Sequence, residues 1–139
     1  MTSYLEATPE AGKAFYQRYH QKGPVTMLNL LRFRKEADYT DLEQLKPAGK
    51  ISGEEAYELY MKHTFPLLKE VGSRVIYYGK SKDFLIGPSE EKWDAILLVE
   101  HKSVEKFISF SQNLEYLKTA GHRMAGLEDS RLLPSVGRD

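Results

Sequence analysis

One short segment brings together side chains that could carry out acid–base chemistry. His122 is one of four histidines and stands beside Arg123, and Asp129 follows shortly after. A histidine next to a cation in a cleft can stay neutral at pH 7 and act as a general base, while an arginine can hold a carboxylate or an enolate oxygen. His122 and Arg123 are therefore the candidate catalytic residues. The commoner alternative is structural: Arg123 pairs with Asp129 or Glu128, and His122 is half exposed.

Two polar residues, Asn29 and Arg32, interrupt the apolar segment 25–33. They are candidate ligand-binding residues, because an amide and a guanidinium can orient a carbonyl or a carboxylate. An unpaired buried amide costs about 1–3 kcal/mol, so each side chain needs a partner or a wet cavity. Side chains alternate along a strand, which predicts that the two lie on opposite faces and do not serve one ligand. In the alternative, Asn29 satisfies a neighbouring backbone or a dimer mate, and Arg32 pairs at the border of the sheet.

Tyr60 and Trp93 are the further candidates for ligand binding. Each ring lies at a polar–apolar border of its predicted element, where an amphipathic aromatic side chain can line a pocket. Aromatic residues at helical or strand spacing are more often simply part of the core.

The residue inventory predicts no metal and no cofactor. The chain has no cysteine, and no pair of its four histidines has metal-ligand spacing. His63 near Pro66 could serve as an axial haem ligand, but a surface histidine is the stronger interpretation. No nucleophile elbow, phosphate loop or dinucleotide fingerprint is present.

Length and charge predict one folded domain over residues 1–139. The 20 basic and 20 acidic residues cancel, which makes nucleic acid and membrane surfaces poor candidate partners. The N-terminal residues lack the apolar core of a signal peptide, and no apolar run approaches the roughly 20 residues that span a bilayer. A cytoplasmic location is the expectation.

Hydrophobic periodicity and capping signals predict a mixed α+β chain. The predicted elements are a helix from Pro9, capped by Thr8, to about Lys22; a strand over 25–33; a long loop over 34–51; a helix from the Ser52–Glu55 capping box to Gly72; strands over 73–82 and 93–100; helices from Ser103 to Gly126; a strand over 128–133; and a frayed tail over 134–139. The loop is predicted to be an exposed insertion in preference to a lid or a partner-facing flap.

Several local details are specific enough to be tested. The first helix should bury Ala11, Phe15 and Tyr19. The long helix should kink or break before Pro66. Gly79 should mark a bulge or a close backbone approach.

Two further expectations concern side-chain direction. Trp93 should share a face with Ala95, because side chains alternate along the third strand. Leu114, Leu117 and Met124 should point inward from the helices near the C-terminus.

The order βαββαβ, after a first extra helix, is that of a ferredoxin-like fold with a four-stranded antiparallel sheet. Helices can cover only one face of such a sheet, yet the strands 25–33 and 93–100 are apolar on both faces. The uncovered face must bury against something, and a second copy is the simplest solution. We expect a homodimer whose two sheets pack face to face.

Several sequence blocks together resemble the proteins grouped as domain of unknown function 1330, in the dimeric α+β-barrel superfamily. The blocks are Met27-Leu-Asn-Leu-Leu-Arg32-Phe33, Ser52-Gly-x-x-Ala-Tyr57-x-x-Tyr60, Leu85-Ile-Gly-Pro88, Trp93-Asp94, His122-Arg123-x-Ala125 and Asp129-Ser-Arg131-Leu. The resemblance implies a ferredoxin-like protomer, a barrel-forming dimer and a cleft between sheet and helices. It implies no particular reaction, because the wider superfamily includes cofactor-free monooxygenases, haem-handling enzymes, small isomerases and ligand-sensing modules.

The leading functional expectation is a homodimer that binds a small apolar or carboxylated metabolite in that cleft. If the protein is an enzyme, the expected chemistry is cofactor-free proton abstraction or oxygenation, with His122 as base and Arg123 and Asn29 as orienting groups. The alternative is a non-catalytic ligand-sensing or assembly module.

Overall fold

The structure is a computed structural model, and it describes residues 2–138. Its elements, in chain order, are α1 (Pro9–Tyr19), β1 (Val25–Phe33), the short 3-10 helix η1 (Glu43–Leu45), α2 (Gly53–Glu70), β2 (Arg74–Lys80), β3 (Ala95–His101), α3 (Val104–Ser111), α4 (Leu114–Thr119), α5 (Gly121–Gly126) and β4 (Leu127–Val136). No helix in this part of the chain combines the length and hydropathy needed to cross a membrane.

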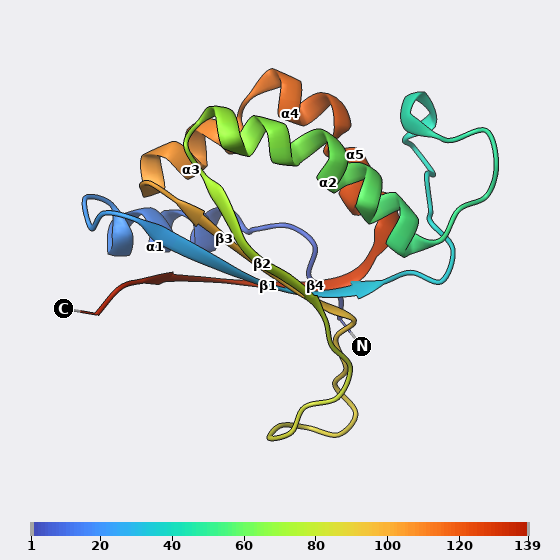
Figure 1. Ribbon diagram of the computed structural model, residues 1–139, viewed down its shortest axis with the longest axis horizontal. Coiled ribbons are helices and arrows are strands. Elements are labelled where there is room, and N and C mark those ends of the chain that lie inside the picture. Colours follow the sequence, from blue (N-terminus) through green and yellow to red (C-terminus); the bar gives the residue numbers. More distant parts are fainter. Residues whose placement is uncertain (1, 139) are drawn as a thin grey trace.

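The four strands form one antiparallel sheet in the order β2-β3-β1-β4. The helices α2 to α5 lie over one face of this sheet, and the hairpin that joins β2 to β3 projects from the other side (Figure 1). This is the βαββαβ topology with an N-terminal helix added, so the predicted ferredoxin-like α+β fold is confirmed. We call the two sides the helix face and the open face.

The helix α2 forms where the sequence predicts it. Ser52 accepts a hydrogen bond from Glu55 N, and the Glu55 carboxylate accepts one from Ser52 N, which completes the predicted capping box. The helix continues from Gly53 to Glu70 without the break expected before Pro66. Pro66 has no N–H to donate to the carbonyl of Lys62, and both residues lie on the exposed side of the helix.

The helix α1 is correctly placed by its Thr8 cap but is less buried than expected. Ala11 is exposed, and Phe15 and Tyr19 are only half-buried, where they pack on Val25 at the end of the sheet. This helix ends at Tyr19, before the predicted end at Lys22. It covers the edge of the core rather than its centre.

The helix α4 also differs from the expectation, because Leu114 and Leu117 are 76% and 52% exposed. Asn113 restarts the helix by accepting hydrogen bonds from the backbone of Glu115 and Tyr116. The new register turns Tyr116 inward in place of the two leucines.

The two outer strands correct two further expectations. The strand β4 continues through Pro134 to Val136, where a frayed tail was predicted. Proline is tolerated there because β4 is an edge strand and pairs only with β1. On β2 the bulge lies between Val75 and Tyr77, not at Gly79, and the Tyr77 ring occupies the space above Gly79.

Candidate functional site

A cavity of about 480 Å³ lies on the helix face, between the sheet and the helices. Its walls are mainly apolar and include Met27, Leu68, Leu97, Val99, Phe110 and Met124. At one side the exposed residues Glu6 and Ala7 line it, so the cavity opens to solvent near the N-terminal segment. Its size and lining are those of a small-molecule site.

Three of the six predicted site residues line this cavity: Asn29 from β1, Tyr60 from α2 and Arg123 from α5. The Asn29 amide donates to the backbone oxygen of Leu97 at 3.1 Å, which is the backbone-satisfying role considered above. No hydrogen bond to the Asn29 side-chain oxygen occurs within residues 2–138. That oxygen can therefore accept a hydrogen bond from a ligand.

Arg123 is a half-buried cation at the wall of the cavity. It donates to the carbonyl oxygen of Leu5 at 2.7 Å and lies 3.4 Å from the hydroxyl of Ser130. Within the described residues it forms no ion pair, and the alternative pairing with Asp129 or Glu128 is not observed. A guanidinium with neutral neighbours beside an apolar cavity is suited to a carboxylate.

Two tyrosine hydroxyls and a threonine add polar groups to the same walls. Tyr60 and Tyr116 share a hydrogen bond of 2.9 Å, and burial holds the pKa of Tyr60 well above its ordinary value. The Tyr60 hydroxyl is thus neutral, and the pair can donate or accept a further hydrogen bond. Thr64 is 2% exposed, and its hydroxyl has no partner among the described residues. Such a group is costly unless a water or a ligand binds it.

Sequence reasoning missed His101, a buried residue that also lines the cavity. Its Nδ1 is 2.7 Å from the hydroxyl of Ser73, and burial lowers its pKa to about 4. The imidazole is therefore neutral at pH 7 but a weak base. The inward alternation of Ala95, Leu97 and Val99 extends to His101 and could have revealed it.

His122 lies in a different place from Arg123, although the two residues are neighbours in α5. It is 5% exposed, and its Nδ1 lies 2.7 Å from the hydroxyl of Tyr39 in the 34–51 loop. Its ring also stacks on His63, at 5.9 Å between centroids and 8° between planes. Burial and the nearby His63 lower the pKa of His122. His122 therefore joins the loop to the helices and does not line the cavity.

The loop is accordingly more than an exposed insertion. Tyr39 is buried against Ala56 and Ala125, and the backbone of Asp38 donates to Ala125 O at 2.9 Å. These contacts hold the loop on α2 and α5.

The other two predicted site residues, Arg32 and Trp93, meet on the open face. The register places Arg131 opposite Leu30, so Arg131 shares the face of Arg32. The two guanidinium carbons lie 4.7 Å (Arg32) and 4.9 Å (Arg131) from the Trp93 ring centroid. Such contacts fit cation–π attraction. As the alternation predicts, Arg32 and Asn29 do not share a site.

Trp93 was expected to share a face with Ala95, which lies on the helix face, and that expectation is wrong. The residue between them, Asp94, interrupts the alternation: its backbone N–H donates to Leu31 O at 2.7 Å, and its carboxylate accepts a hydrogen bond from Phe33 N at 2.8 Å. The β3 strand begins only after this residue, at Ala95. Trp93 is consequently turned to the arginines.

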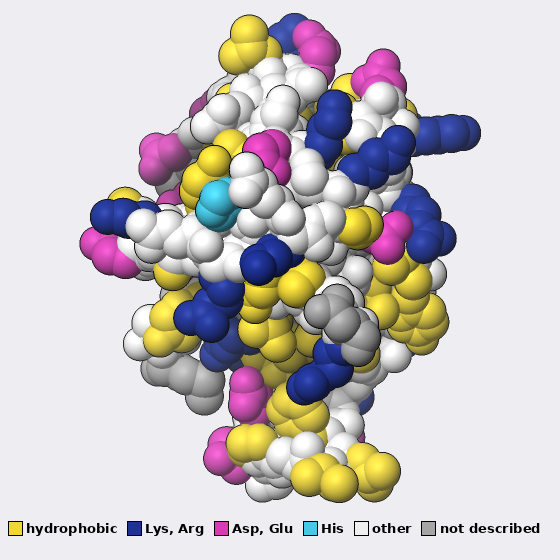
Figure 2. Space-filling view, turned by 90° about the vertical axis from the view of Figure 1, so that its left-hand side faces the viewer, with side chains coloured by type: hydrophobic (Ala, Val, Ile, Leu, Met, Phe, Trp, Pro, Cys, Tyr) yellow, Lys and Arg dark blue, Asp and Glu magenta, His cyan; other side chains and the backbone are white. Residues whose placement is uncertain are grey.

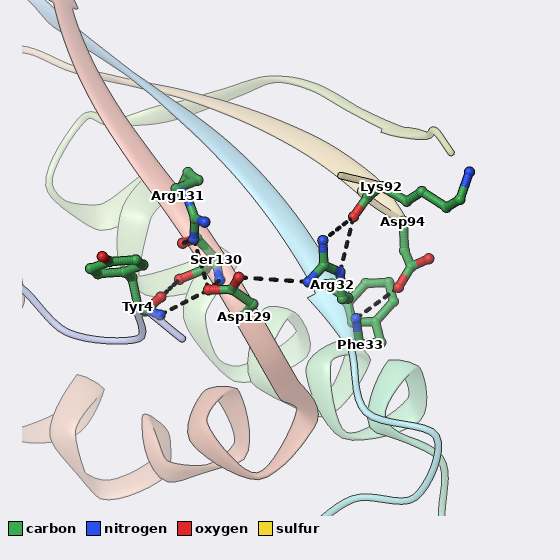
Figure 3. Close-up of polar contacts among 8 residues, drawn as sticks. All are labelled: Tyr4, Arg32, Phe33, Lys92, Asp94, Asp129, Ser130 and Arg131. Atoms are coloured by element: carbon green, nitrogen blue, oxygen red, sulfur yellow. Dashed lines mark hydrogen bonds and ion pairs between the residues drawn. The ribbon is translucent and has the colours of Figure 1, made fainter. Parts of the chain in front are cut away.

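A buried carboxylate, Asp129, organises the polar part of the open face (Figure 3). Burial alone would raise its pKa, but hydrogen bonds from the backbone of Tyr4 and Ser130 and from Arg131 outweigh burial and lower it. Arg32 lies 3.6 Å from the same carboxylate and donates to the backbone oxygen of Lys92 at 3.0 and 2.7 Å. The network joins β1, β4 and the base of the projecting hairpin.

Residues 2–138 contain no group of three or more acidic or histidine side chains placed to hold a metal ion. The cavity groups instead offer one cation, several hydroxyls, an amide oxygen and a neutral imidazole in mainly apolar surroundings, with the exposed side chain of Glu6 at the opening. This set can bind an uncharged or carboxylated molecule by shape and hydrogen bonds.

Comparison with known proteins is informative at the level of structure. No family model matches the chain, and no curated protein sequence matches it. A ferredoxin-like protein of unknown function from Bacteroides fragilis, described as dimeric, superimposes with a TM-score of 0.51 at 13% identity, over 84% of this chain and 98% of that one. The Arabidopsis thaliana protein At3g17210 superimposes with a TM-score of 0.51 at 12% identity, over 83% and 96% of the two chains. Both support the fold.

The crystal structures of the RPA0582 protein, one of them of the methylated protein, are much more similar. The one described as a protein of unknown function from Rhodopseudomonas palustris has a TM-score of 0.85 and 32% identity, covering 99% of each chain. The methylated form has a TM-score of 0.86 over 100% of this chain and 98% of that one. This chain therefore belongs to the same family as the RPA0582 protein.

Proposed function

We propose that the protein binds a small, mainly apolar carboxylate in the helix-face cavity and works as a homodimer in the cytoplasm. The observation that carries the proposal is the half-buried guanidinium of Arg123, which has no acidic partner within residues 2–138 and lines a largely apolar cavity of about 480 Å³. A carboxylate would supply the missing counter-charge, while Asn29 and the Tyr60–Tyr116 pair offer hydrogen bonds. The apolar walls would bury the rest of the molecule.

Binding without catalysis is the simpler form of this proposal. His122, the expected base, is hydrogen-bonded to Tyr39 outside the cavity lining. His101 does line the cavity, but a pKa of about 4 makes it a weak base at neutral pH. The groups that remain recognise and orient a ligand, as a ligand-sensing module requires.

The homodimer is supported by the open face. Its central strands present Leu28, Leu30, Ile96 and Leu98, which are only half-buried, and Leu133 beside them is 62% exposed. A second copy would cover this face, since a two-fold contact matches the same surface on both subunits. The Bacteroides fragilis protein with this fold is described as dimeric. Membership of the group named domain of unknown function 1330, on the sequence blocks quoted above, is part of the same proposal.

The binding proposal is tested with matched ligands and matched variants. Native mass spectrometry of the purified protein is expected to show a bound small molecule. In calorimetric titration, aromatic and aliphatic carboxylates should bind at least tenfold more tightly than their amides. Arg123→Met should remove that preference, because a charge-assisted hydrogen bond contributes about 1.5–3 kcal/mol. Lys118→Met, which removes an exposed cation outside the cavity lining, should keep it.

Two results would contradict this proposal. One is the absence of a bound molecule together with no binding by any of the carboxylates. The other is an equal loss of affinity in the Lys118→Met control, which would mean that general charge and not Arg123 attracts the anion.

A further inference from the structure

The hairpin between β2 and β3 continues beyond the sheet as an ordered arm, residues 81–92. Ser81 N donates to Asp94 O at 3.0 Å, and Trp93 N donates to Lys82 O at 3.1 Å. Farther out, Asp83 pairs with Lys92 through a β-bridge and an ion pair. The arm is thus an extension of the two strands with a defined direction.

The tip of the arm is apolar and exposed. Leu85 and Ile86 are 99% and 91% exposed, and Phe84 is 41% exposed. Gly87 has φ +158°, and the Phe84 ring lies against it, where a Cβ atom would be 2.6 Å from the ring. The turn is therefore built to hold the Phe84 ring and to present the two aliphatic side chains outward. Two adjacent aliphatic side chains this exposed mark an interaction site more readily than a solvated turn.

The arm leaves the body on the open-face side (Figure 1). Figure 2 shows hydrophobic side chains from the tip of the arm, at the lower end of the view, up to the underside of the body, with Lys and Arg side chains beside them. The exposed tip and the open face consequently point to the same partner.

We propose that the arm packs against a second copy of this chain, and that Phe84, Leu85 and Ile86 are buried against the partner's body in the dimer. This inference rests on the proposed homodimer. One limb of the arm, residues 81–86, can extend roughly 20 Å, whereas two packed sheets lie only about 10 Å apart. The arm of a face-to-face dimer therefore passes the partner's sheet and reaches its side. Two-fold symmetry makes the contact reciprocal, so each interface contains two arms.

Charge also favours a second copy over a lipid surface. The arm carries Lys82 and Lys92 against Asp83, Glu90 and Glu91, a net charge of −1. On the open face, Arg32 and Arg131 exceed Asp129 by one positive charge. The open face of a second copy thus carries a charge opposite to that of the arm, whereas an anionic membrane would repel the arm.

The experiment compares the wild type with the double variant Leu85→Asp, Ile86→Asp in sedimentation equilibrium. The variant should raise the dimer Kd at least tenfold, because the exchanged tips lose their apolar contact. Leu114→Asp is the control, since Leu114 is equally aliphatic and 76% exposed but lies on α4, on the helix face. It should leave the Kd unchanged. Circular dichroism confirms that both variants are folded.

A second measurement locates the tip. The chain has no cysteine, so Leu85→Cys carries a single thiol, which is labelled with a photoreactive benzophenone maleimide. In a mixture of isotopically light and heavy protein, cross-links between light and heavy peptides are expected, and they should map to the partner's body.

The outcomes separate the two proposals. A monomeric wild type at micromolar concentration would overturn the dimer and the arm contact together. A wild-type dimer whose Kd does not respond to the tip variant, with cross-links only inside one chain, would overturn the arm contact and leave the dimer intact. Cosedimentation of the wild type, but not of the tip variant, with phosphatidylcholine vesicles, at an unchanged dimer Kd, would assign the tip to a membrane instead.

Discussion

The strand β1 presents side chains to both faces of the sheet, and their surroundings differ between the two faces. On the helix face, Leu31 is fully buried in the core, and Asn29 faces a cavity in which apolar walls hold a few polar groups. On the open face, Leu30 is half-buried, and Arg32 joins a network of charged and aromatic side chains. A concave cavity with mixed polar and apolar walls suits a small molecule, whereas a broad apolar surface with a charged border suits a protein partner. Side chains of β1 that point to the helix face therefore belong to the core and the cavity, whereas those that point to the open face belong to the proposed partner surface.

The largest expected effect distinguishes the two faces directly. Leu31→Ala should lower the free energy of unfolding by about 3 kcal/mol at any protein concentration, because it leaves a cavity in the core of a single chain. Leu30→Ala should cost less in dilute solution, and its cost should grow at concentrations where the wild type dimerises. Urea unfolding at two protein concentrations measures both. Equal, concentration-independent losses would contradict the division between the faces.

The pH dependence of stability should reveal His101 in the cavity. Its folded pKa of about 4 lies below the unfolded value of about 6.5, so the unfolded state binds more protons between these values. Stability contributed by the neutral imidazole is therefore present above pH 6.5 and lost as the pH falls through this window. Between pH 6.5 and 4.5 the wild type should lose about 2 kcal/mol more than His101→Gln. Parallel pH profiles would show that burial of His101 has no energetic consequence.

The smallest effect concerns the loop, which lies away from both surfaces. Tyr39→Phe removes the hydroxyl that contacts His122 while keeping the buried ring, so stability should fall by about 1 kcal/mol. Limited proteolysis should then cut the 34–51 loop faster, and the carboxylate affinity of the cavity should not change. A loss of affinity as large as that of Arg123→Met would instead place the loop within the binding site.

The predicted and observed side-chain directions agree where the prediction depended on periodicity. Alternation along β1 correctly separated Asn29 from Arg32, and the spacing on α2 correctly turned Tyr60 inward. His122 and Arg123 were predicted to share a site because they are adjacent in the sequence, but neighbouring residues on a helix point about 100° apart. Asp94 likewise turned Trp93 to the open face through contacts with β1 that are distant in sequence.

The amino-acid sequence by itself determined the elements and their order, because caps, periodicity and strand alternation act over a few residues. Thr8, the Ser52–Glu55 capping box and the alternation of 25–33 are of this kind. Only the tertiary structure decided which side chains lie together. Arg123 and Tyr60 line the same cavity, His122 contacts Tyr39, and Trp93 contacts two arginines. These contacts join residues from separate elements, and the packing of α2 and α5 on the sheet sets the distances between them. For the same reason the direction of the arm at residues 81–92, and with it the surface proposed for a second copy, became visible only in the folded chain.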